Sequence, residues 1–418
     1  MMNLRNVLLL VMGLVACGST FGQPTAPFQW SQFLGPNRDG NSQEVGLNLN
    51  WQSRPPAVLW KVELGGGFSS MSFSGRRLFT MTERGERIYV VAVDIGTGEE
   101  SWSYDIGPKY LDYQKFGSGP RATPTFHQGQ LFALAPTGAL ACLDAVDGRE
   151  VWSVNAIELV GAPDRADDQY YWGMSASPLI EGNLVIVQPG GEEGNSVAAF
   201  HKRDGKLVWK VGDDPPGYGS PIGVYAAGLR QVICTTGLSI LSVDPKDGRL
   251  LWRFEWVNKF KMNSATPVWI DGLLFISALH EPGAAALEIV REGDKIVPRP
   301  KWQSQDLKTH FATPIVIDGF VYATHGGGGN LRCLDLNTGE VKWRDSTTGK
   351  SSLIAVEGHL IALSDQGDLR LVEASPAGFK SKGEVLGVLA PKAWASPALS
   401  QGRLYIRDEK HLMCLDLR

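Results

Sequence analysis

The chain has 418 residues, with 40 Lys and Arg against 44 Asp and Glu, and its formal net charge is −4 at pH 7. No run of basic residues is longer than a pair such as Arg76 and Arg77. This argues against nucleic acid as a partner, because a phosphate backbone is bound by clustered positive charge. The 49 Gly and 24 Pro are typical of a fold in which many short strands are joined by tight turns.

Residues 1–22 predict a secretory signal peptide. Arg5 precedes an apolar run over residues 7–16, and small residues follow it. The run would span only about 15 Å as a helix, half of a hydrocarbon core, so we do not expect a transmembrane anchor. Two processing routes stay open: cleavage after Gly22, or lipidation of Cys17, which ends the lipobox-like stretch LVAC. Both predict an exported protein, either periplasmic or anchored to a membrane as a lipoprotein.

Residues 23–53 are expected to form an N-terminal extended segment. A strand-like stretch, AVLWKV at residues 57–62, follows it. This strand comes before the first full repeat and belongs to no unit of its own.

A motif of Asp, then Gly, then Trp at constant spacing recurs along the chain. The Asp can accept hydrogen bonds from the backbone of a turn, the Gly can take the positive φ of that turn, and the Trp falls on the next strand. A fifth copy has His201 in place of the Asp and keeps Gly205 and Trp209. The full copies are Asp94 with Trp102, Asp144 with Trp152, Asp244 with Trp252, and Asp335 with Trp343.

A second sequence motif precedes these hairpins. A Ser-Pro or Thr-Pro pair introduces two apolar stretches separated by a Gly turn, as in ATPVWIDGLLFI at residues 265–276. The two sequence motifs together predict four strands in each unit. The spacing of the units is typical of the blades of a β-propeller. We therefore expect an all-β chain in which the repeated tryptophans pack between neighbouring blades.

The two ends of the repeat region complement each other. The last unit stops at Arg418, just after its Asp416, and so lacks its outer strand. The strand at residues 57–62 can supply it, which would close the ring and remove free sheet edges. We therefore predict one eight-bladed β-propeller of four-stranded blades over residues 54–418, closed by the N-terminal strand. Seven blades is the alternative count.

The repeat resembles the pyrroloquinoline quinone (PQQ) repeat, the blade motif of quinoprotein dehydrogenases. WSQFLGPNRDGNS from Trp30, GPRATP from Gly119, YGSPI from Tyr218 and HFATP from His310 are similar to stretches in exported bacterial propellers of the PQQ-like family. Relatives of this shape include the scaffold lipoprotein of the outer-membrane protein assembly machine, which binds protein and no quinone. The resemblance implies an eight-bladed propeller and leaves both functions open, because one fold hosts many functions.

We favour a non-enzymatic scaffold that binds another envelope protein, without a cofactor and as a monomer. The resemblance implies, for the enzymes, an adjacent Cys-Cys disulfide and a calcium ion held by Glu, Asn and Asp. This chain has no Cys-Cys pair, so we assign no catalytic residue and no metal site. The alternative is a PQQ-dependent dehydrogenase with calcium, or another propeller that binds a small ligand.

A ligand site is expected where the repeats differ from one another. The residue three positions before the Pro of each inner strand should line one rim of the channel, and its identity changes between blades. Aromatic faces beside Arg121 and Lys350 would suit a flat anionic ligand. A polar rim filled by water is the other interpretation. The candidates from this position and the one before it are Phe68, Arg121, Tyr218, Asn263, His310, Lys350 and Trp394.

Four cysteines follow the signal region. Cys142, Cys333 and Cys414 occupy the same C-L-D position of the repeat, so they belong to different blades, and Cys234 is the fourth. A disulfide needs two cysteines side by side. We therefore expect four free thiols, buried as small apolar side chains.

Overall fold

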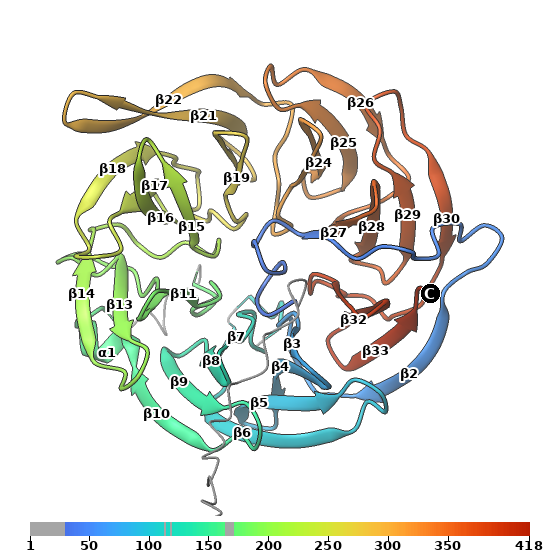
Figure 1. Cartoon of the computed structure of the whole chain (residues 1–418), viewed down its shortest axis with the longest axis horizontal. Helices are drawn as coiled ribbons and strands as arrows, with labels where there is room; N and C mark the ends of the chain where they lie inside the picture. Colours follow the sequence, from blue (N-terminus) through green and yellow to red (C-terminus); the bar gives the residue numbers. More distant parts are fainter. Residues whose placement is uncertain (1–29, 113, 118, 164–170) are drawn as a thin grey trace, which may run out of the picture.

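The computed structural model describes residues 30–112, 114–117, 119–163 and 171–418. Within these ranges, eight sheets form a ring around a central channel (Figure 1). Each sheet is one blade of a β-propeller. The prediction of eight four-stranded blades is confirmed, and the alternative count of seven is wrong. The predicted signal peptide and Cys17 lie outside the described residues.

Blades 1 to 4 follow one another along the chain, each ordered from the channel outward. Blade 1 contains β3 (Ser72–Ser74), β4 (Arg77–Arg84), β5 (Arg87–Asp94) and β6 (Glu100–Pro108); blade 2 contains β7 (Thr125–His127), β8 (Gln130–Leu134), β9 (Ala139–Asp144) and β10 (Glu150–Asn155), followed by helix α1 (Ala156–Val160); blade 3 contains β11 (Leu179–Glu181), β12 (Leu184–Val187), β13 (Val197–His201) and β14 (Leu207–Val211); blade 4 contains β15 (Ile222–Ala226), β16 (Leu229–Thr235), β17 (Ser239–Val243) and β18 (Leu250–Glu255).

Blades 5 to 7 continue the ring. Blade 5 contains β19 (Val268–Ile270), β20 (Leu273–Ser277), β21 (Ala284–Glu292) and β22 (Lys295–Ser304), and its outer hairpin projects beyond the other blades (Figure 1); blade 6 contains β23 (Ile315–Ile317), β24 (Phe320–His325), β25 (Asn330–Asp335) and β26 (Val341–Asp345); blade 7 contains β27 (Ser351–Val356), β28 (His359–Ser364), β29 (Leu369–Glu373) and β30 (Ser381–Val385), with the short β1 (Asn41–Ser42) added in parallel to β27.

Blade 8 closes the ring with strands from both ends of the chain. It contains β31 (Ala398–Ser400), β32 (Arg403–Arg407) and β33 (His411–Asp416), and its outer strand is β2 (Ala57–Glu63). β2 pairs with β33 in antiparallel register, with Ala57 opposite Asp416 and Trp60 opposite Cys414. The predicted closure by the N-terminal strand is therefore confirmed.

Five tryptophans of the repeated units each lie against a turn glycine of the next blade: Trp60, Trp102, Trp152, Trp209 and Trp302. Trp252 and Trp343 differ, since their Nε1 groups donate to Oε1 of Gln231 and to the carbonyl of Ser375 and no described turn glycine lies against their rings. A Cβ added at Gly148 in blade 2 would lie 2.5 Å from Cε3 of Trp102 in blade 1. One blade further round, Nε1 of Trp152 donates a hydrogen bond to the carbonyl of Lys202 at 2.9 Å, and the ring covers Gly205. The Gly and the Trp of the motif therefore act in neighbouring units, which explains why both recur together.

Replacement of Gly148 by Ala should lower the free energy of unfolding by about 2–4 kcal/mol, because it adds a clash with Trp102 to the cost of a positive φ. Gly129 is the matched control, since its φ of 82° is close to the 75° of Gly148 and no atom lies within 4 Å of an added Cβ. Gly129→Ala should lose only about 1–2 kcal/mol. Denaturant unfolding of both variants measures the difference, and equal losses would contradict the packing role of Gly148.

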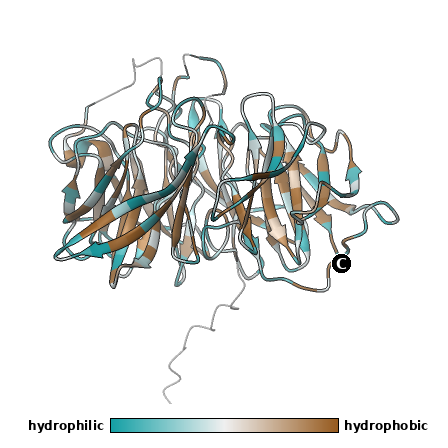
Figure 2. Ribbon diagram, turned by 90° about the horizontal axis from the view of Figure 1, so that it is seen from above, coloured by the Kyte–Doolittle hydropathy of each residue, from teal (hydrophilic) through white to brown (hydrophobic). Residues whose placement is uncertain are grey.

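The core consists of several apolar clusters, most of them shared by strands of neighbouring blades, and apolar residues recur along the strands of the ring (Figure 2). Cys142, Cys234, Cys333 and Cys414 are all buried and free, as predicted. Burial raises the pKa of the Cys142 thiol to about 12, so this thiol stays protonated and unreactive. Among the described residues, no helix has both the length and the apolar character needed to cross a bilayer.

Candidate functional site

Hydroxyl groups of the Ser-Pro and Thr-Pro pairs connect the inner strands of successive blades. Each hydroxyl oxygen accepts a hydrogen bond from the backbone N–H of the equivalent residue in the preceding blade. This arrangement explains why the residue before the Pro is Ser or Thr. The bonds run from Ser70 to Thr123 (3.1 Å), Thr123 to Ser177 (2.9 Å), Ser177 to Ser220 (2.9 Å), Ser220 to Thr266 (3.0 Å) and Thr266 to Thr313 (3.2 Å).

Residues 30–42, which we call the plug segment, enter the channel beside this row of hydroxyls. The carbonyl of Trp30 accepts a hydrogen bond from the N–H of Phe73 at 2.8 Å, and the carbonyl of Gly40 accepts one from Ala355 at 2.9 Å. The segment then runs outward across blade 7 to β2 (dark blue in Figure 1). The plug segment, which is part of the predicted N-terminal segment of residues 23–53, thus crosses the middle of the ring.

Arg38 fixes the plug segment to three blades. Its side chain is 2% exposed. The Nη1 group donates to the carbonyls of Ser177 at 3.2 Å and Pro221 at 2.9 Å, and the Nη2 group donates to the carbonyl of Pro178 and, at 3.4 Å, to Oγ1 of Thr125. A guanidinium is suited to this position because its donors spread in one plane.

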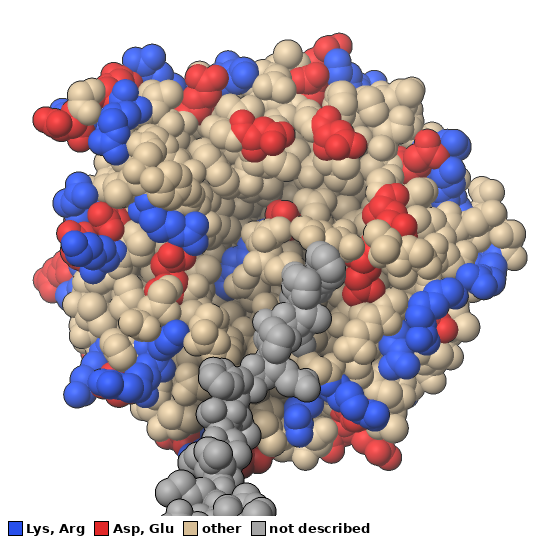
Figure 3. Space-filling model, viewed as in Figure 1, with Lys and Arg blue, Asp and Glu red and all other residues tan. Residues whose placement is uncertain are grey.

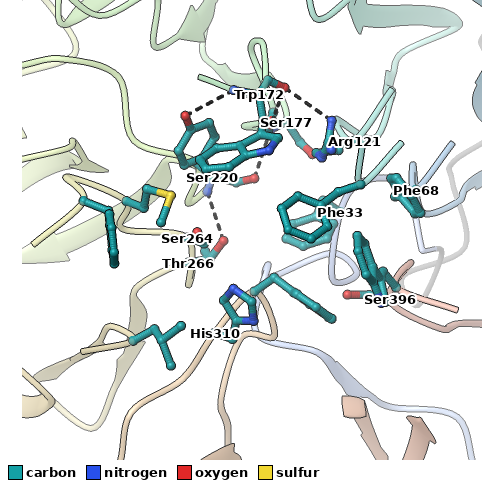
Figure 4. A pocket seen from close by; sticks show the side chains of 18 of the residues that line it. Phe33, Phe68, Arg121, Trp172, Ser177, Ser220, Ser264, Thr266, His310 and Ser396 are labelled. Atoms are coloured by element: carbon teal, nitrogen blue, oxygen red, sulfur yellow. Dashed lines mark hydrogen bonds between the residues drawn. The ribbon is translucent and has the colours of Figure 1, made fainter. Parts of the chain in front are cut away.

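A cavity of about 450 Å³ occupies the channel beside the plug segment, and Phe33 of that segment lies among its lining side chains (Figure 4). The predicted channel position lines it in all eight blades. Of the predicted site residues, Phe68, Arg121, Tyr218, His310, Lys350 and Trp394 are brought together here; the same position adds Ser175, Ser264 and Phe311.

Asn263 does not line the cavity, although we expected it at the rim. It is fully buried, and its Nδ2 donates to the carbonyls of Thr236 at 2.9 Å and Trp256 at 2.8 Å. Its Oδ1 accepts a hydrogen bond from Asn258 at 2.8 Å. The amide thus stabilises a loop of blade 4, because the residue before the channel position turns away from the channel in this blade.

Several lining residues come from parts of the chain that do not repeat. They could not be found from the motif, because they lie in loops of different length and in the plug segment. Their shared feature is a large aromatic or apolar side chain. They are Phe33, Phe116, Trp172, Phe260, Met262 and Leu279.

Aromatic rings and two cations form a connected group on one wall of the cavity. The ring of Phe68 stacks on Trp394 with centroids 4.9 Å apart, and the guanidinium of Arg121 lies 5.4 Å from the Phe68 centroid. Nζ of Lys350 lies 4.2 Å from the centroid of Phe311 and 5.6 Å from that of Trp394. These distances are typical of cation–π contacts.

The two cations differ in what neutralises them. Nη2 of Arg121 lies 3.8 Å from a carboxylate oxygen of the buried Asp112 and donates to the carbonyl of Gly117 at 3.0 Å. Nζ of Lys350 has no hydrogen-bond acceptor or ion pair within the described ranges. Burial lowers the pKa of Lys350, and the charge of Asp365 opposes this effect. Lys350 is therefore the cation that a ligand could neutralise.

His310 lies close to Lys350, and its Nδ1 is buried without a hydrogen-bond partner among the described residues. Burial, and to a smaller extent the charges of Lys350 and His280, lower the pKa of His310 to about 4. The imidazole is therefore neutral at physiological pH.

This pKa predicts a pH-dependent loss of stability. Between pH 6.5 and 4, the unfolded chain takes up a proton at His310 that the folded chain does not bind, so acidification through this window favours unfolding. Between pH 6.5 and 4, the free energy of unfolding of the wild type should therefore fall by on the order of 1–3 kcal/mol more than that of His310→Asn. Urea unfolding of both proteins at several pH values tests this, and a constant difference across the window would contradict it.

The cavity does not fit a quinone held with calcium. Calcium takes six to eight oxygen ligands, carboxylates prominent among them, and none of the described lining side chains is Asp or Glu. Nor do the described residues contain a group of three or more His, Cys, Asp or Glu that could hold a metal ion. The wall can stack a flat ring and neutralise one anion, but its described residues offer no calcium ligand set.

The fold and the site define a propeller of PQQ-like repeats whose channel is filled on one side by its own N-terminal segment. A family model described as outer membrane protein assembly factor BamB matches residues 86–345. The chain belongs to this family.

Named relatives support the assignment over most of the chain. BamB of Moranella endobia (strain PCIT) is 25% identical over 328 residues, covering 74% of this chain and 77% of the relative. BamB of Escherichia coli (strain K12) is 24% identical over 331 residues, covering 75% and 77%. The dehydrogenase subunit of the quinone alcohol dehydrogenase of Gluconacetobacter polyoxogenes is 32% identical over 126 residues, but these are only 28% of this chain and 16% of that one.

Solved structures of BamB and of a quinoprotein-type dehydrogenase both share the propeller fold of this chain. BamB from Moraxella catarrhalis aligns with a TM-score of 0.60 at 14% identity, covering 86% of this chain and 99% of that one. A europium-containing methanol dehydrogenase aligns with a TM-score of 0.65, also at 14% identity, covering 91% and 89%. At this identity the likeness establishes the propeller and does not separate scaffold from enzyme.

Proposed function

We propose that this chain is a non-enzymatic scaffold propeller of the cell envelope that binds another protein and supports outer-membrane protein assembly. The observation that carries the proposal is the family match over residues 86–345, together with BamB relatives that cover about three quarters of the chain. In this proposal residues 1–22 export the protein, Cys17 is the candidate for a lipid tether, residues 23–53 are the N-terminal segment and residues 54–418 are the propeller.

The described cavity lining and the separate thiols weigh against quinone chemistry. Lys and Arg are interspersed with Asp and Glu around the face in Figure 3, so no field of one sign dominates it. The short stretch shared with a quinone alcohol dehydrogenase keeps the enzyme as the second candidate. Against it stand the absence of carboxylates among the described lining residues and the four separate buried thiols.

Affinity capture tests the proposal. The exposed C-terminal Arg418 permits a tag after the last residue, and the protein is isolated from its own envelope under mild detergent. We expect one or a few envelope proteins in amounts comparable to the bait, and none with an unrelated exported bait carrying the same tag. A bait that emerges alone, and that oxidises alcohols when PQQ and calcium are supplied, would contradict the proposal.

A further inference from the structure

The mouth of the cavity carries an exposed apolar edge in the loop between β6 and β7. Phe116 is 47% exposed although it lines the cavity, and its ring lies 6.3 Å from that of Trp394. Leu111 in the same loop is 61% exposed. Lys392 holds the loop by donating a hydrogen bond to the carbonyl of Phe116 at 3.1 Å. Exposed apolar side chains that border an aromatic cavity are typical of a binding surface.

Inside this mouth, one charge and several ring faces are open to a ligand. Arg121 is already neutralised by Asp112, whereas Nζ of Lys350 lies over two ring faces without an acceptor among the described residues. One unneutralised ammonium beside a stack of rings favours a single carboxylate next to an aromatic group. It disfavours a phosphate or a polycarboxylate, whose further charges would stay unpaired.

We propose that the mouth binds a segment of the partner protein in which an aromatic side chain enters the cavity and a neighbouring Asp or Glu carboxylate pairs with Nζ of Lys350. This inference rests on the proposed function. A protein segment is favoured over a small molecule because an occupant confined to the cavity would leave the exposed part of Phe116 in water. Aromatic anchors that fill a pocket are the usual centres of binding energy in protein interfaces.

Photo-cross-linking in cells tests the location and the chemistry of the partner segment. p-Benzoylphenylalanine is placed at Phe116 and, as a matched control, at Val208 on the outer strand of blade 3, which is 48% exposed. We expect a protein adduct at position 116 and not at 208, and a cross-linked peptide with an aromatic residue beside an Asp or Glu. Equal adducts at both positions, or a peptide without these residues, would overturn the inference.

Lysine substitutions test the charge pairing with the captured partner. Lys350→Met should weaken its binding at least tenfold, and Lys350→Arg should restore most of it, with melting temperatures unchanged. Lys342→Met is the control, because Lys342 pairs with Glu340 at 2.7 Å on the outer strand of blade 6. If the partner binds Lys350→Met as tightly as wild type, the inferred pairing with Lys350 is wrong, but the proposed function of binding a protein is still supported. If the wild type captures no protein, both the inferred partner segment and the proposed function are wrong.

A synthetic peptide copying the cross-linked segment separates a protein ligand from a small one. Its binding should change the fluorescence of the cavity tryptophans, Trp172 and Trp394. Replacing the acidic residue by its amide, or the aromatic residue by Ala, should each weaken binding about tenfold. If 3-phenylpropionate alone binds as tightly as the peptide, the cavity recognises a small aromatic acid, which would overturn the assignment to a protein segment.

Discussion

Replacement of Trp209 by Ala should lower the free energy of unfolding by about 3–5 kcal/mol, the usual cost of removing a large buried ring. Trp209 lies on the outer strand of blade 3 and is 8% exposed. Its Nε1 donates to the carbonyl of Pro245 in blade 4 at 3.1 Å, and its ring covers Gly248 of the same turn. The substitution therefore opens a cavity between two blades and leaves a carbonyl without its partner.

The neighbouring residue Val208 provides the control, because it faces solvent on the same strand. Val208→Ala should change stability by no more than about 0.5 kcal/mol. Guanidinium chloride unfolding followed by far-UV circular dichroism gives both values. If Trp209→Ala unfolds within that margin of wild type, the tryptophans of the repeat do not hold the blades together.

Replacement of Arg38 by Met should cost about 3–5 kcal/mol, although it removes a charge from the interior. Met fills much of the same volume but leaves the carbonyls of Ser177, Pro178 and Pro221 without the donors they have in the folded chain. Each buried acceptor without a donor costs about 1–3 kcal/mol. The plug segment should also become easier to cleave, since Arg38 holds it to blades 3 and 4 and, together with the carbonyl of Ser31, to blade 2.

Arg54 is the matched control in the N-terminal region. It lies on the surface, where its Nη2 donates to the carbonyl of Arg418 at 3.0 Å, so Arg54→Met should have little effect. Limited proteolysis with N-terminal sequencing, alongside urea unfolding, compares the two variants. Equal stability and equal cleavage would show that the plug segment is held by something other than Arg38.

The repeats made the architecture predictable, because each blade uses the same chemistry for the same purpose. The pairing of β2 with β33 followed from a missing strand at one end and a surplus strand at the other. The contacts that Gly148 and Gly205 make could not be predicted from the sequence. The sequence places Gly and Trp in one motif, whereas the contact joins the Gly of one blade to the Trp of the preceding one, a relation that appears only in the closed ring.

The site was predictable only where the repeat positions it. Phe68, Arg121, Lys350 and Trp394 face the cavity because their position in the blade fixes their direction. Arg38 had no such signal, since a single Arg in a non-repeating segment does not reveal that carbonyls of blades 3 and 4 and a hydroxyl of blade 2 surround it. Differences in loop length likewise hid the aromatic residues at the mouth of the cavity.

Native mass spectrometry of the protein isolated from its own envelope tests most directly whether this propeller works by binding protein. The measurement weighs the assembly with everything that stays bound to it. We predict the mass of the propeller plus one or more polypeptide partners, with no added mass from a quinone or calcium, and loss of the partner from Lys350→Met. A propeller without a partner that carries the mass of PQQ and a calcium ion would contradict the scaffold function.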